Sequence, residues 1–437
     1  MREAGPLPMT FGRGGSLRGR ARVPGDKSIS HRALMLGAMA LGTSRIEGLS
    51  EGGDVRSTAA ALATMGAGIG READGTVWVR GVGTGGLLQP ERPLDMGNSG
   101  TSARLLMGLA ASHDLTAILH GDASLSSRPM ARVAEPLRRL GADIVAAPGT
   151  RLPIALRGLA PAAALTHRLD VPSAQVKSAL LLAGLNIPGV TRLIETVPTR
   201  DHSERMLALF GADIRRDGPE IAIRGEAELR PQQLRVPGDP SAAAFLAVAA
   251  LVVPGSELLI ENVCVNPLRA GLFEVLRAMG GDIAFLDTRE ECGEPVADLR
   301  VRHSALTALD VPPEVAPSMI DEYPILFVAA AFAAGTTRTS GLAELRVKES
   351  DRLAAMAAGL CAIGVPVEES ADGLAVRGSG GEPVPGGGRI DPRLDHRIAM
   401  SFAVAGLHAA EPVGIADMTP ASTSWPGFAD AVEALRR

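Results

Sequence analysis

One pattern recurs five times along the 437-residue chain and constrains its fold more than any other feature. An amphipathic helical segment is followed by a glycine and then by a short apolar stretch, as in "LRRLGADIV" and "LALFGADIR". Glycine is favoured at the left-handed position that ends a helix, so each copy predicts a helix end followed by a strand. The glycines are spaced 75, 70, 69 and 84 residues apart, at Gly66, Gly141, Gly211, Gly280 and Gly364. The terminal "WPGFADAVEALRR" indicates a sixth such helix that stops before its glycine.

A second, more apolar class of segment alternates with the first, which predicts buried helices inside and amphipathic helices outside. These segments are residues 28–40, 99–111, 173–185, 240–253, 324–334 and 396–407. Six units of this kind, three per domain, predict an α/β architecture. A solenoid is the alternative, although its usual period is shorter, about 20–50 residues. The longest apolar runs, 242–253 and 324–334, fall short of the roughly 18 residues that a membrane span needs.

The pentapeptide "RVPGD" occurs at Arg22 and again at Arg235, 213 residues later, and marks the start of each half. In the second copy Asp239 is expected to cap a helix and Pro240 to be its first residue. In the first copy Lys27 takes the place of this proline. A cation there opposes the helix dipole at a cost of about 0.3–1 kcal/mol. We therefore expect Lys27 to face an anion bound at the helix start, although an exposed, solvated lysine is the alternative.

Cations recur at other expected helix starts, where the helix dipole disfavours them. They are Arg104, Arg128, Arg200, Lys348, Arg352 and Arg397. Together they predict a shared ligand that carries phosphate or carboxylate groups, which arginine binds in bidentate fashion. Ser28 and Arg32 lie on the same helix face as one another.

Two acidic positions could take part in proton transfer. Asp321, in "DEYP", either caps an apolar helix or acts as a general base. In "RVKESDRL", Lys348, Glu349 and Arg352 are expected within one helical turn, either as a surface ion-pair cluster or as a carboxylate held among cations for acid–base work.

Composition excludes several classes of protein. The net charge of −5 gives no indication of a nucleic-acid-binding protein. The three cysteines are widely spaced, which favours a reducing compartment and neither a disulfide framework nor a zinc site. The basic, glycine-rich N-terminus lacks the apolar core of a signal peptide, so we expect a cytoplasmic protein with no membrane partner.

Eight motifs in order resemble those of the 5-enolpyruvylshikimate-3-phosphate synthase family (3-phosphoshikimate 1-carboxyvinyltransferases), over nearly the whole chain after about residue 16. They are "VPGDKSISHRA", "DMGNSGTSARLL", "GDASLSSRPM", "VPSAQVKSALLLAGL", "VPGDPSAAAF", "DEYPILFVAAAF", "ELRVKESDRL" and "LDHRIAM". Details such as "PTRDH" are similar to the bacterial branch called class II. The resemblance implies a two-domain inside-out α/β barrel of six βαβαββ repeats. Residues 24–236 would form the first domain, and residues 1–23 with 237–437 the second, with hinge crossings near 23–27 and 236–239.

The implied reaction transfers the enolpyruvyl group of phosphoenolpyruvate to the 5-hydroxyl of shikimate 3-phosphate by addition and elimination, and releases phosphate. It belongs to the shikimate pathway of aromatic amino acid biosynthesis. The resemblance implies small-molecule substrates, no metal or organic cofactor, no nucleic acid and a monomeric protein. A transferase acting on UDP-N-acetylglucosamine, an RNA-end-processing cyclase and a non-catalytic anion-binding protein on the same scaffold are the alternatives.

By resemblance, shikimate 3-phosphate is bound by Lys27, Ser28, Arg32, Ser173, Ala174, Gln175, Arg200, Asp321 and Lys348. Phosphoenolpyruvate is bound by Lys27, Gly100, Arg128, Gln175, Arg352 and Arg397. The implied catalytic residues are Asp321, Glu349, Lys27 and Lys348. Asp321 would take the proton of the 5-hydroxyl and Glu349 would serve the methylene carbon, but the sequence leaves open which carboxylate performs each transfer.

One position departs from the family pattern. Many relatives carry a lysine before "T-F-P" near the C-terminus, whereas this chain has Thr423-Ser424-Trp425-Pro426. A cationic contact to phosphoenolpyruvate is therefore either absent here or supplied by another residue. Gly100 is the small residue that leaves room for glyphosate in the phosphoenolpyruvate site, so the resemblance implies sensitivity to that inhibitor.

Overall fold

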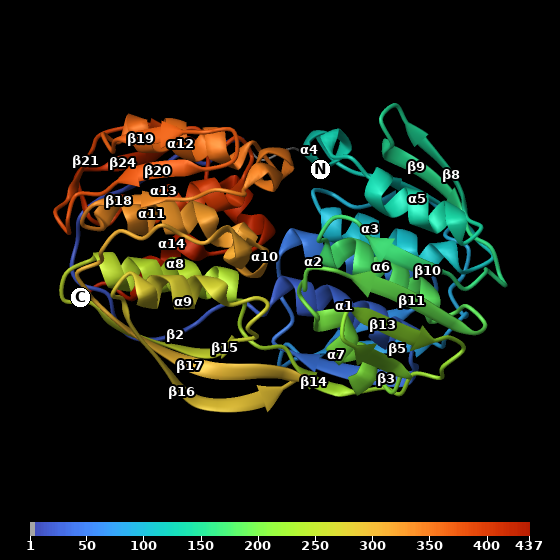
Figure 1. Ribbon diagram of the computed structural model, residues 1–437. Helices are drawn as coiled ribbons and strands as arrows, with labels where there is room; N and C mark the ends of the chain where they lie inside the picture. The colour runs from blue at the N-terminus through green and yellow to red at the C-terminus, as the bar shows by residue number, and fades with distance from the viewer. Residues whose placement is uncertain (1–4) are drawn as a thin grey trace. The chain divides into compact units, whose positions relative to one another are not determined.

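The structure is a computed structural model that describes residues 5–437; residues 1–4, the start of the predicted second domain, lie outside it. The chain divides into two compact units (Figure 1). Unit 2 consists of Gly25–Pro237 together with Glu290–Glu294. Unit 1 consists of the chain up to Pro24, Gly238–Arg289 and Pro295–Arg437.

Three buried helices form the centre of unit 2: α1 (Lys27–Met39), α3 (Gly100–Ala111) and α6 (Ala174–Gly184). Each begins after a residue whose side chain accepts a backbone N–H of the first turn, as the capping preference predicts. Helices α2 (Gly53–Thr64), α5 (Ala131–Arg139) and α7 (His202–Leu209) pack on them, whereas α4 (Ala123–Ser127) packs on the strand Arg151–Arg157.

Three four-stranded sheets of one design surround these helices. In each sheet one edge strand pairs in parallel with its neighbour, and the remaining pairs are antiparallel. From that edge strand, the first sheet has the order β14 (Gln233–Arg235), β3 (Leu41–Glu47), β5 (Val77–Val82) and β4 (Gly68–Arg71). The second is β6 (Leu94–Asp95), β7 (Thr116–His120), β9 (Arg151–Arg157) and β8 (Asp143–Ala147). The third is β10 (Thr166–Leu169), β11 (Val190–Glu195), β13 (Glu220–Arg224) and β12 (Ile214–Asp217).

Unit 1 repeats this plan around α8 (Pro240–Val252), α11 (Tyr323–Phe332) and α13 (His396–Gly406), which are buried along their whole length. Its four-stranded sheet has the order β16 (Asp282–Glu291), β17 (Glu294–Arg302), β15 (Glu257–Cys264) and β2 (Arg18–Arg22). The smaller sheets are β18 (Thr336–Arg338), β20 (Leu374–Arg377) and β19 (Val367–Glu369); β21 (Val384–Gly386) and β23 (Ala409–Glu411); and β1 (Met9–Phe11), β24 (Val413–Ile415) and β22 (Arg389–Ile390).

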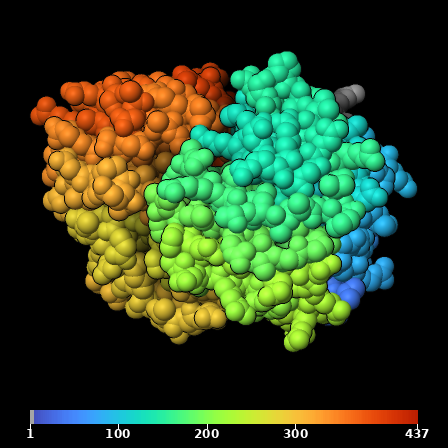
Figure 2. Space-filling view, turned by 45° about the vertical axis from the view of Figure 1, so that its right-hand side comes forward, coloured from blue at the N-terminus to red at the C-terminus, as the bar shows by residue number. Residues whose placement is uncertain are grey.

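Unit 1 contains further helices and 3-10 turns. They are α9 (Gly271–Ala278), α10 (Ala316–Met319), α12 (Arg352–Ala362) and α14 (Phe428–Ala434), with the 3-10 turns η1 (Pro313–Val315), η2 (Ile320–Glu322), η3 (Ala343–Val347) and η4 (Thr419–Thr423). The yellow surface of β15–β17 and the orange and red surface of the later repeats lie next to one another within this unit (Figure 2).

The two "RVPGD" copies lie where the chain passes from one unit to the other. Strand β2 precedes α1 of unit 2 but pairs in parallel with β15 of unit 1, and β14 precedes α8 of unit 1 but pairs in parallel with β3 of unit 2. Both copies need their glycine, because other atoms of the protein lie too close to its backbone for a side chain to fit. A Cβ on Gly25 would lie 1.9 Å from the carbonyl oxygen of Gly48, and one on Gly238 would lie 2.8 Å from Val23 Cγ2.

Strand β1, near the N-terminus, belongs to the sheet of the last repeat of unit 1. This pairing was not predicted from the sequence. Strand β1 runs antiparallel to β24, with Phe11 opposite Val413, and Phe11 is part of the hydrophobic core.

The five repeat glycines confirm the predicted helix ends. All have positive φ: 100° at Gly66, 110° at Gly141, 93° at Gly211, 96° at Gly280 and 77° at Gly364.

One helical stretch, Pro313–Phe332, is long and apolar enough to cross a membrane by length and composition alone, because short turns extend it upstream of α11. Within its most apolar part, 72% of the residues are buried inside the protein. Helix α11, which forms the end of this stretch, packs against α8 and α13. Packing in the core of unit 1 therefore accounts for its composition.

Candidate active site

Lys27 is the first residue of α1 and is held by a carboxylate. Asp26 caps the helix by accepting from the Ile29 N–H at 2.8 Å. The Lys27 ammonium lies 3.0 Å from Asp54 Oδ2 in the first turn of α2, and its side chain is only 18% exposed. The alternative of a solvated surface lysine is therefore wrong. Asp54, which offsets the unfavourable interaction of Lys27 with the helix dipole, was missed in the sequence.

Arg32 is buried one turn further along α1. Its guanidinium donates to Ser203 Oγ at 2.7 Å, to Ser178 Oγ at 2.6 Å and to the Ser28 carbonyl at 2.7 Å. Burial lowers its pKa to about 10; nearby Arg200 acts in the same direction, and Asp26 and Glu204 act against it. Arg32 thus supports the backbone of Ser28 from within, and Arg200 is close enough to influence it electrostatically.

The starts of α3 and α6 bring together a second group of polar residues in unit 2. Arg104 donates to Gln175 Oε1 at 2.7 Å, and Arg128 donates to Asn98 Oδ1 at 2.6 Å. Gly100 lies between the two arginines, because a Cβ on it would be 2.9 Å from Arg104 Nη1 and 3.3 Å from Arg128 Nη1. The Ser173 side chain caps α6 by accepting from the Val176 N–H at 3.4 Å, with Ala174 as the first helical residue. Lys27 and Arg104 thus lie near the starts of α1 and α3. The prediction of a helix start at Arg128 is wrong, because Arg128 follows the last residue of α4 as its C-cap.

Three carboxylates contact the guanidinium of Arg352 in unit 1. The distances are 2.8 Å to Asp395 Oδ2, 2.6 Å to Glu349 Oε2 and 3.3 Å to Asp321 Oδ1. Burial disfavours the charged form of Arg352, but the carboxylates of Asp395, Glu349 and Asp321 outweigh it and raise the guanidinium pKa. Its side chain is 1% exposed, so the alternative of a surface ion-pair cluster is wrong.

The structure corrects the predicted helical turn at Lys348–Arg352. Helix α12 starts only at Arg352, capped by the Asp351 side chain, and Lys348 has the non-helical ψ of −147°. The Lys348 ammonium contacts Glu344 Oε1 at 2.9 Å and Asp321 Oδ1 at 3.7 Å. With this non-helical backbone, the Lys348 ammonium lies beside both carboxylates.

Asp321 does not act as a helix cap. It lies in η2, and Glu322 holds the cap position of α11 without a side-chain capping bond. Arg397 donates to the Asp321 carbonyl at 2.9 Å, to Glu322 Oε1 at 3.3 Å and to Ser241 Oγ at 3.2 Å. Arg352 and Arg397 therefore hold the segment that bears Asp321.

Several partners of these residues escaped sequence reasoning. Asp395, buried at the cap of α13, and Glu322, next to Asp321, bind the two arginines. Asp395 stands directly before the apolar run of α13, so a capping signal was present, but its link to Arg352 depends on packing. His31 was left open; its Nδ1 lies 2.7 Å from Thr58 Oγ1, and burial, then Lys27 and Arg32, lower its pKa well below the usual value.

No group of three or more His, Cys, Asp or Glu residues suited to a metal ion occurs within residues 5–437. At the departure from the family pattern, Thr423 donates to the Pro420 carbonyl at 2.9 Å, and Trp425 packs edge-on against Phe428 at 5.3 Å between ring centroids.

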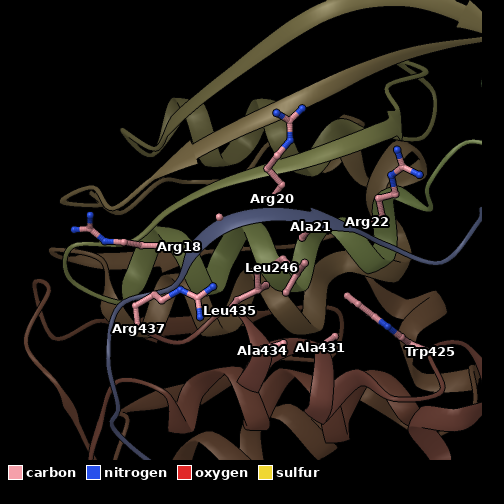
Figure 3. Close-up of a pocket in the computed structure, with 11 residues that line it drawn as sticks. Arg18, Arg20, Ala21, Arg22, Leu246, Trp425, Ala431, Ala434, Leu435 and Arg437 are labelled. Atoms are coloured by element: carbon pink, nitrogen blue, oxygen red, sulfur yellow. The ribbon is translucent and has the colours of Figure 1, made fainter.

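A cavity of about 230 Å³ lies beside β2 in unit 1. Trp425 and Leu246 line it, and Figure 3 shows Arg20 and Arg22 directed away from them. Both arginines pair with Glu261 of β15, at 2.6 Å and 3.0 Å. This cavity contains none of the expected site residues.

Comparisons with known proteins agree with one another. A family model described as EPSP synthase (3-phosphoshikimate 1-carboxyvinyltransferase) matches residues 12–432. The 3-phosphoshikimate 1-carboxyvinyltransferase of Sphingopyxis alaskensis is 61% identical and covers 100% of both chains. That of Zymomonas mobilis is 58% identical over 98% of this chain and 96% of its own.

Solved structures show the same likeness. An EPSP synthase from Acinetobacter baumannii superimposes with a TM-score of 0.88 and 41% identity over 98% of each chain. The enolpyruvyl transferase NikO from Streptomyces tendae has a TM-score of 0.77, at 17% identity over 99% of this chain and 98% of its own, and shares the fold. These neighbours confirm the predicted two-domain inside-out α/β barrel.

Proposed function

Because the chain belongs to the EPSP synthase (3-phosphoshikimate 1-carboxyvinyltransferase) family, we propose which of its residues bind and transform the two substrates. It is an enzyme of the shikimate pathway that transfers the enolpyruvyl group of phosphoenolpyruvate to the 5-hydroxyl of shikimate 3-phosphate and releases phosphate. This membership sets aside the UDP-N-acetylglucosamine transferase, the RNA-end cyclase and the non-catalytic anion-binding protein.

Shikimate 3-phosphate is assigned mainly to unit 2. The cations Lys27 and Arg200 supply positive charge, and the starts of α1 and α6 supply the positive ends of helix dipoles; both suit a phosphate and a carboxylate. Arg32 supports this assignment indirectly through its bond to the Ser28 carbonyl. Ligands from this unit are Lys27, Ser28, Arg32, Ser173, Ala174, Gln175 and Arg200, and Asp321 and Lys348 of unit 1 complete the set.

Phosphoenolpyruvate is assigned to residues of both units. Gly100 supports this assignment because the absence of a Cβ lets the guanidinium groups of Arg104 and Arg128 lie close to its backbone. Arg352 and Arg397 are held in place by carboxylates before any substrate binds, which reduces the entropy lost on binding. The full set is Lys27, Gly100, Arg128, Gln175, Arg352 and Arg397. Glyphosate competes for this site in the proposal.

The observation that supports the proposed mechanism best is that the Arg352 guanidinium contacts both Asp321 and Glu349, so the two carboxylates lie near one another. Glu349 protonates the methylene carbon of phosphoenolpyruvate, and its C2 becomes electrophilic. Asp321 takes the proton of the 5-hydroxyl, whose oxygen then bonds to C2. Loss of a proton from the new methyl group to Glu349 and departure of phosphate from C2 restore the double bond. Lys348 orients the hydroxyl, and the cations stabilise the developing charges.

A phosphate-release assay with both substrates tests this function. The wild type should release phosphate only when both are present. Asp321→Asn and Glu349→Gln should each still bind shikimate 3-phosphate measurably and lose turnover by about 100-fold or more. Deuterium exchange from solvent into the methylene group separates their roles: it should fail in Glu349→Gln and persist in Asp321→Asn. The reverse pattern would exchange the two assignments.

The proposal also includes a cytoplasmic monomer that needs no metal, nucleic acid or membrane. Light scattering during gel filtration should give a mass near 45.1 kDa, and activity should survive treatment with a chelator. A dimer mass or loss of activity on chelation would contradict these parts.

A further inference from the structure

Four charged residues, Lys177, Glu195, Glu204 and Arg216, form a cluster inside unit 2 that the mechanism does not use. We call it the Lys177 cluster. Lys177 lies on α6 and its side chain is 0% exposed. Its ammonium contacts Glu195 Oε1 at 3.0 Å and Glu204 Oε1 at 2.8 Å. Arg216 of β12 contacts Glu195 Oε2 at 3.1 Å, so the cluster contains two cations and two carboxylates.

The cluster holds the segment that carries Arg200. Glu195 Oε1 accepts from the Thr199 N–H at 3.0 Å and from its hydroxyl at 2.5 Å, and the Lys177 ammonium donates to the Thr199 carbonyl at 3.1 Å. Both backbone hydrogen-bonding groups of the residue directly before Arg200 are thus fixed from the interior.

The same lysine is tied to the other end of the shikimate 3-phosphate site. Helix α6 starts at Ala174, so Lys177 lies one turn after Ser173, Ala174 and Gln175. The neighbouring Ser178 accepts hydrogen bonds from Arg32 and Ser203 at 2.6 Å and 2.7 Å. Lys177 therefore joins the start of α6 to the segment before Arg200.

A fully enclosed ammonium is expensive for folding, and well-packed apolar residues often replace a buried ion pair without loss of stability. Burial also raises the pKa of Glu204, because it disfavours the charged carboxylate, whereas the positive charge of Lys177 lowers that pKa. Stability alone thus gives no reason for a lysine at this position, whereas the hydrogen bond to the Thr199 carbonyl needs a donor there.

We propose that Lys177 is a positioning residue for shikimate 3-phosphate, because it holds the backbone before Arg200 in register with the start of α6. This inference rests on the proposed function, which assigns Arg200 and Ser173–Gln175 to that substrate. Lys177 itself contacts neither substrate.

The test is a charge-balanced pair of variants. Lys177→Met combined with Glu204→Gln removes one cation and one carboxylate and leaves the Glu195–Arg216 pair. Glu204→Gln alone is the matched control, because it keeps Lys177, Glu195 and Thr199 connected. KM for each substrate and the Kd of shikimate 3-phosphate alone, by calorimetry, are measured in both.

The double variant should raise KM and Kd for shikimate 3-phosphate by about tenfold or more and leave KM for phosphoenolpyruvate within about threefold. The control should change neither by more than about twofold. Equal effects on both substrates, or shikimate 3-phosphate values equal to those of the control, would overturn the proposal.

If the double variant does not fold, a second variant still tests the proposal. Glu195→Gln keeps the side-chain shape but removes the charge opposite Lys177, and should raise Kd for shikimate 3-phosphate by about threefold or more. A wild-type value would overturn the proposal. Failure of the proposed function is distinguishable, because the wild-type protein would then show no turnover of shikimate 3-phosphate.

Discussion

At the scale of single residues, charge at a helix start is tolerated because specific carboxylates oppose it. The Lys27 ammonium pairs with Asp54 at 3.0 Å. Arg352 has three, and the planar guanidinium suits them because its N–H groups point in several fixed directions. The two cations are therefore not equivalent, and geometry should matter more at Arg352.

Arg352→Lys tests this point. A lysine keeps the charge but cannot reach Asp321, Glu349 and Asp395 together, so kcat/KM should fall by about 100-fold or more, equivalent to about 2.7 kcal/mol. Arg277→Lys is the matched control, because Arg277 is half exposed and pairs with Glu274 on the surface of α9. Steady-state kinetics measure both. A fall below tenfold would show that charge alone suffices at Arg352.

Gly100→Ala tests the space beside Arg128. The new Cβ would lie 2.9 Å from Arg104 Nη1 and 3.3 Å from Arg128 Nη1, so both side-chain ends must move. KM for phosphoenolpyruvate should rise by about tenfold, and glyphosate should inhibit less strongly, because both use this space in the proposal. Gly53→Ala is the control, since a Cβ there meets nothing within 4 Å. Unchanged KM and inhibition would contradict the assignment of Gly100.

His31 gives a pH-dependent contribution to stability. Burial, with Lys27 and Arg32, lowers its folded-state pKa, so the folded protein favours the neutral ring. Its contribution is therefore present above the unfolded pKa of about 6.5 and is lost as pH falls toward the folded value. Relative to His31→Asn, the wild type should lose up to about 1.4 kcal/mol of stability per pH unit below about 6.5. Urea unfolding at several pH values checks this, and parallel curves would contradict it.

At the scale of helices and strands, local signals predicted most of the fold. The segment expected at 28–40 is α1 (Lys27–Met39), and that at 396–407 is α13 (His396–Gly406). Capping residues and glycine ends are encoded within a few neighbours, which explains this accuracy. The bend at Lys348 was missed because the Asp351 cap competes with helix continuation.

Partners distant in sequence could not be predicted in the same way. The contact of Asp395 with Arg352, and the pairing of β1 with β24, depend on packing between segments separated by many residues. The sequence pointed to the cations and to Asp321 and Glu349, but not to Asp54, Glu322 and Asp395, which hold them.

Lys27→Pro tests the comparison between the two "RVPGD" helices. Proline is the first residue of α8 in the second copy, and its missing N–H costs little at that position. The variant should keep its stability within about 1 kcal/mol, since an unfavourable charge–dipole interaction and the Asp54 pair are lost together. Phosphate release should fall by about 1,000-fold. Thermal unfolding and the phosphate assay measure the two effects, and comparable losses in both would contradict the comparison.

At the scale of the whole molecule, the two units differ in how much of each comes from one continuous stretch of chain. Residues 25–237 contain all three buried helices and all three sheets of unit 2, including β14 as the parallel partner of β3. Unit 1 instead depends on β1 and β2 from the N-terminus. Only unit 2 is thus nearly continuous along the chain.

A fragment of residues 25–237 should therefore fold alone and unfold cooperatively in a circular dichroism melt. It lacks Glu294, whose Oε1 lies 2.7 Å from His202 Nδ1 in a fully buried pair, so it should be less stable than unit 2 in the whole protein by about 1–3 kcal/mol.

A fragment of residues 25–232 is the matched control, because it differs from the first fragment only in lacking β14 and the short stretch after it. That fragment leaves β3 without its parallel neighbour and should melt at a lower temperature or without cooperativity. Fragment 238–437 lacks both N-terminal strands and should not fold. Equal melting of the two unit 2 fragments would show that β14 adds nothing to the stability of unit 2.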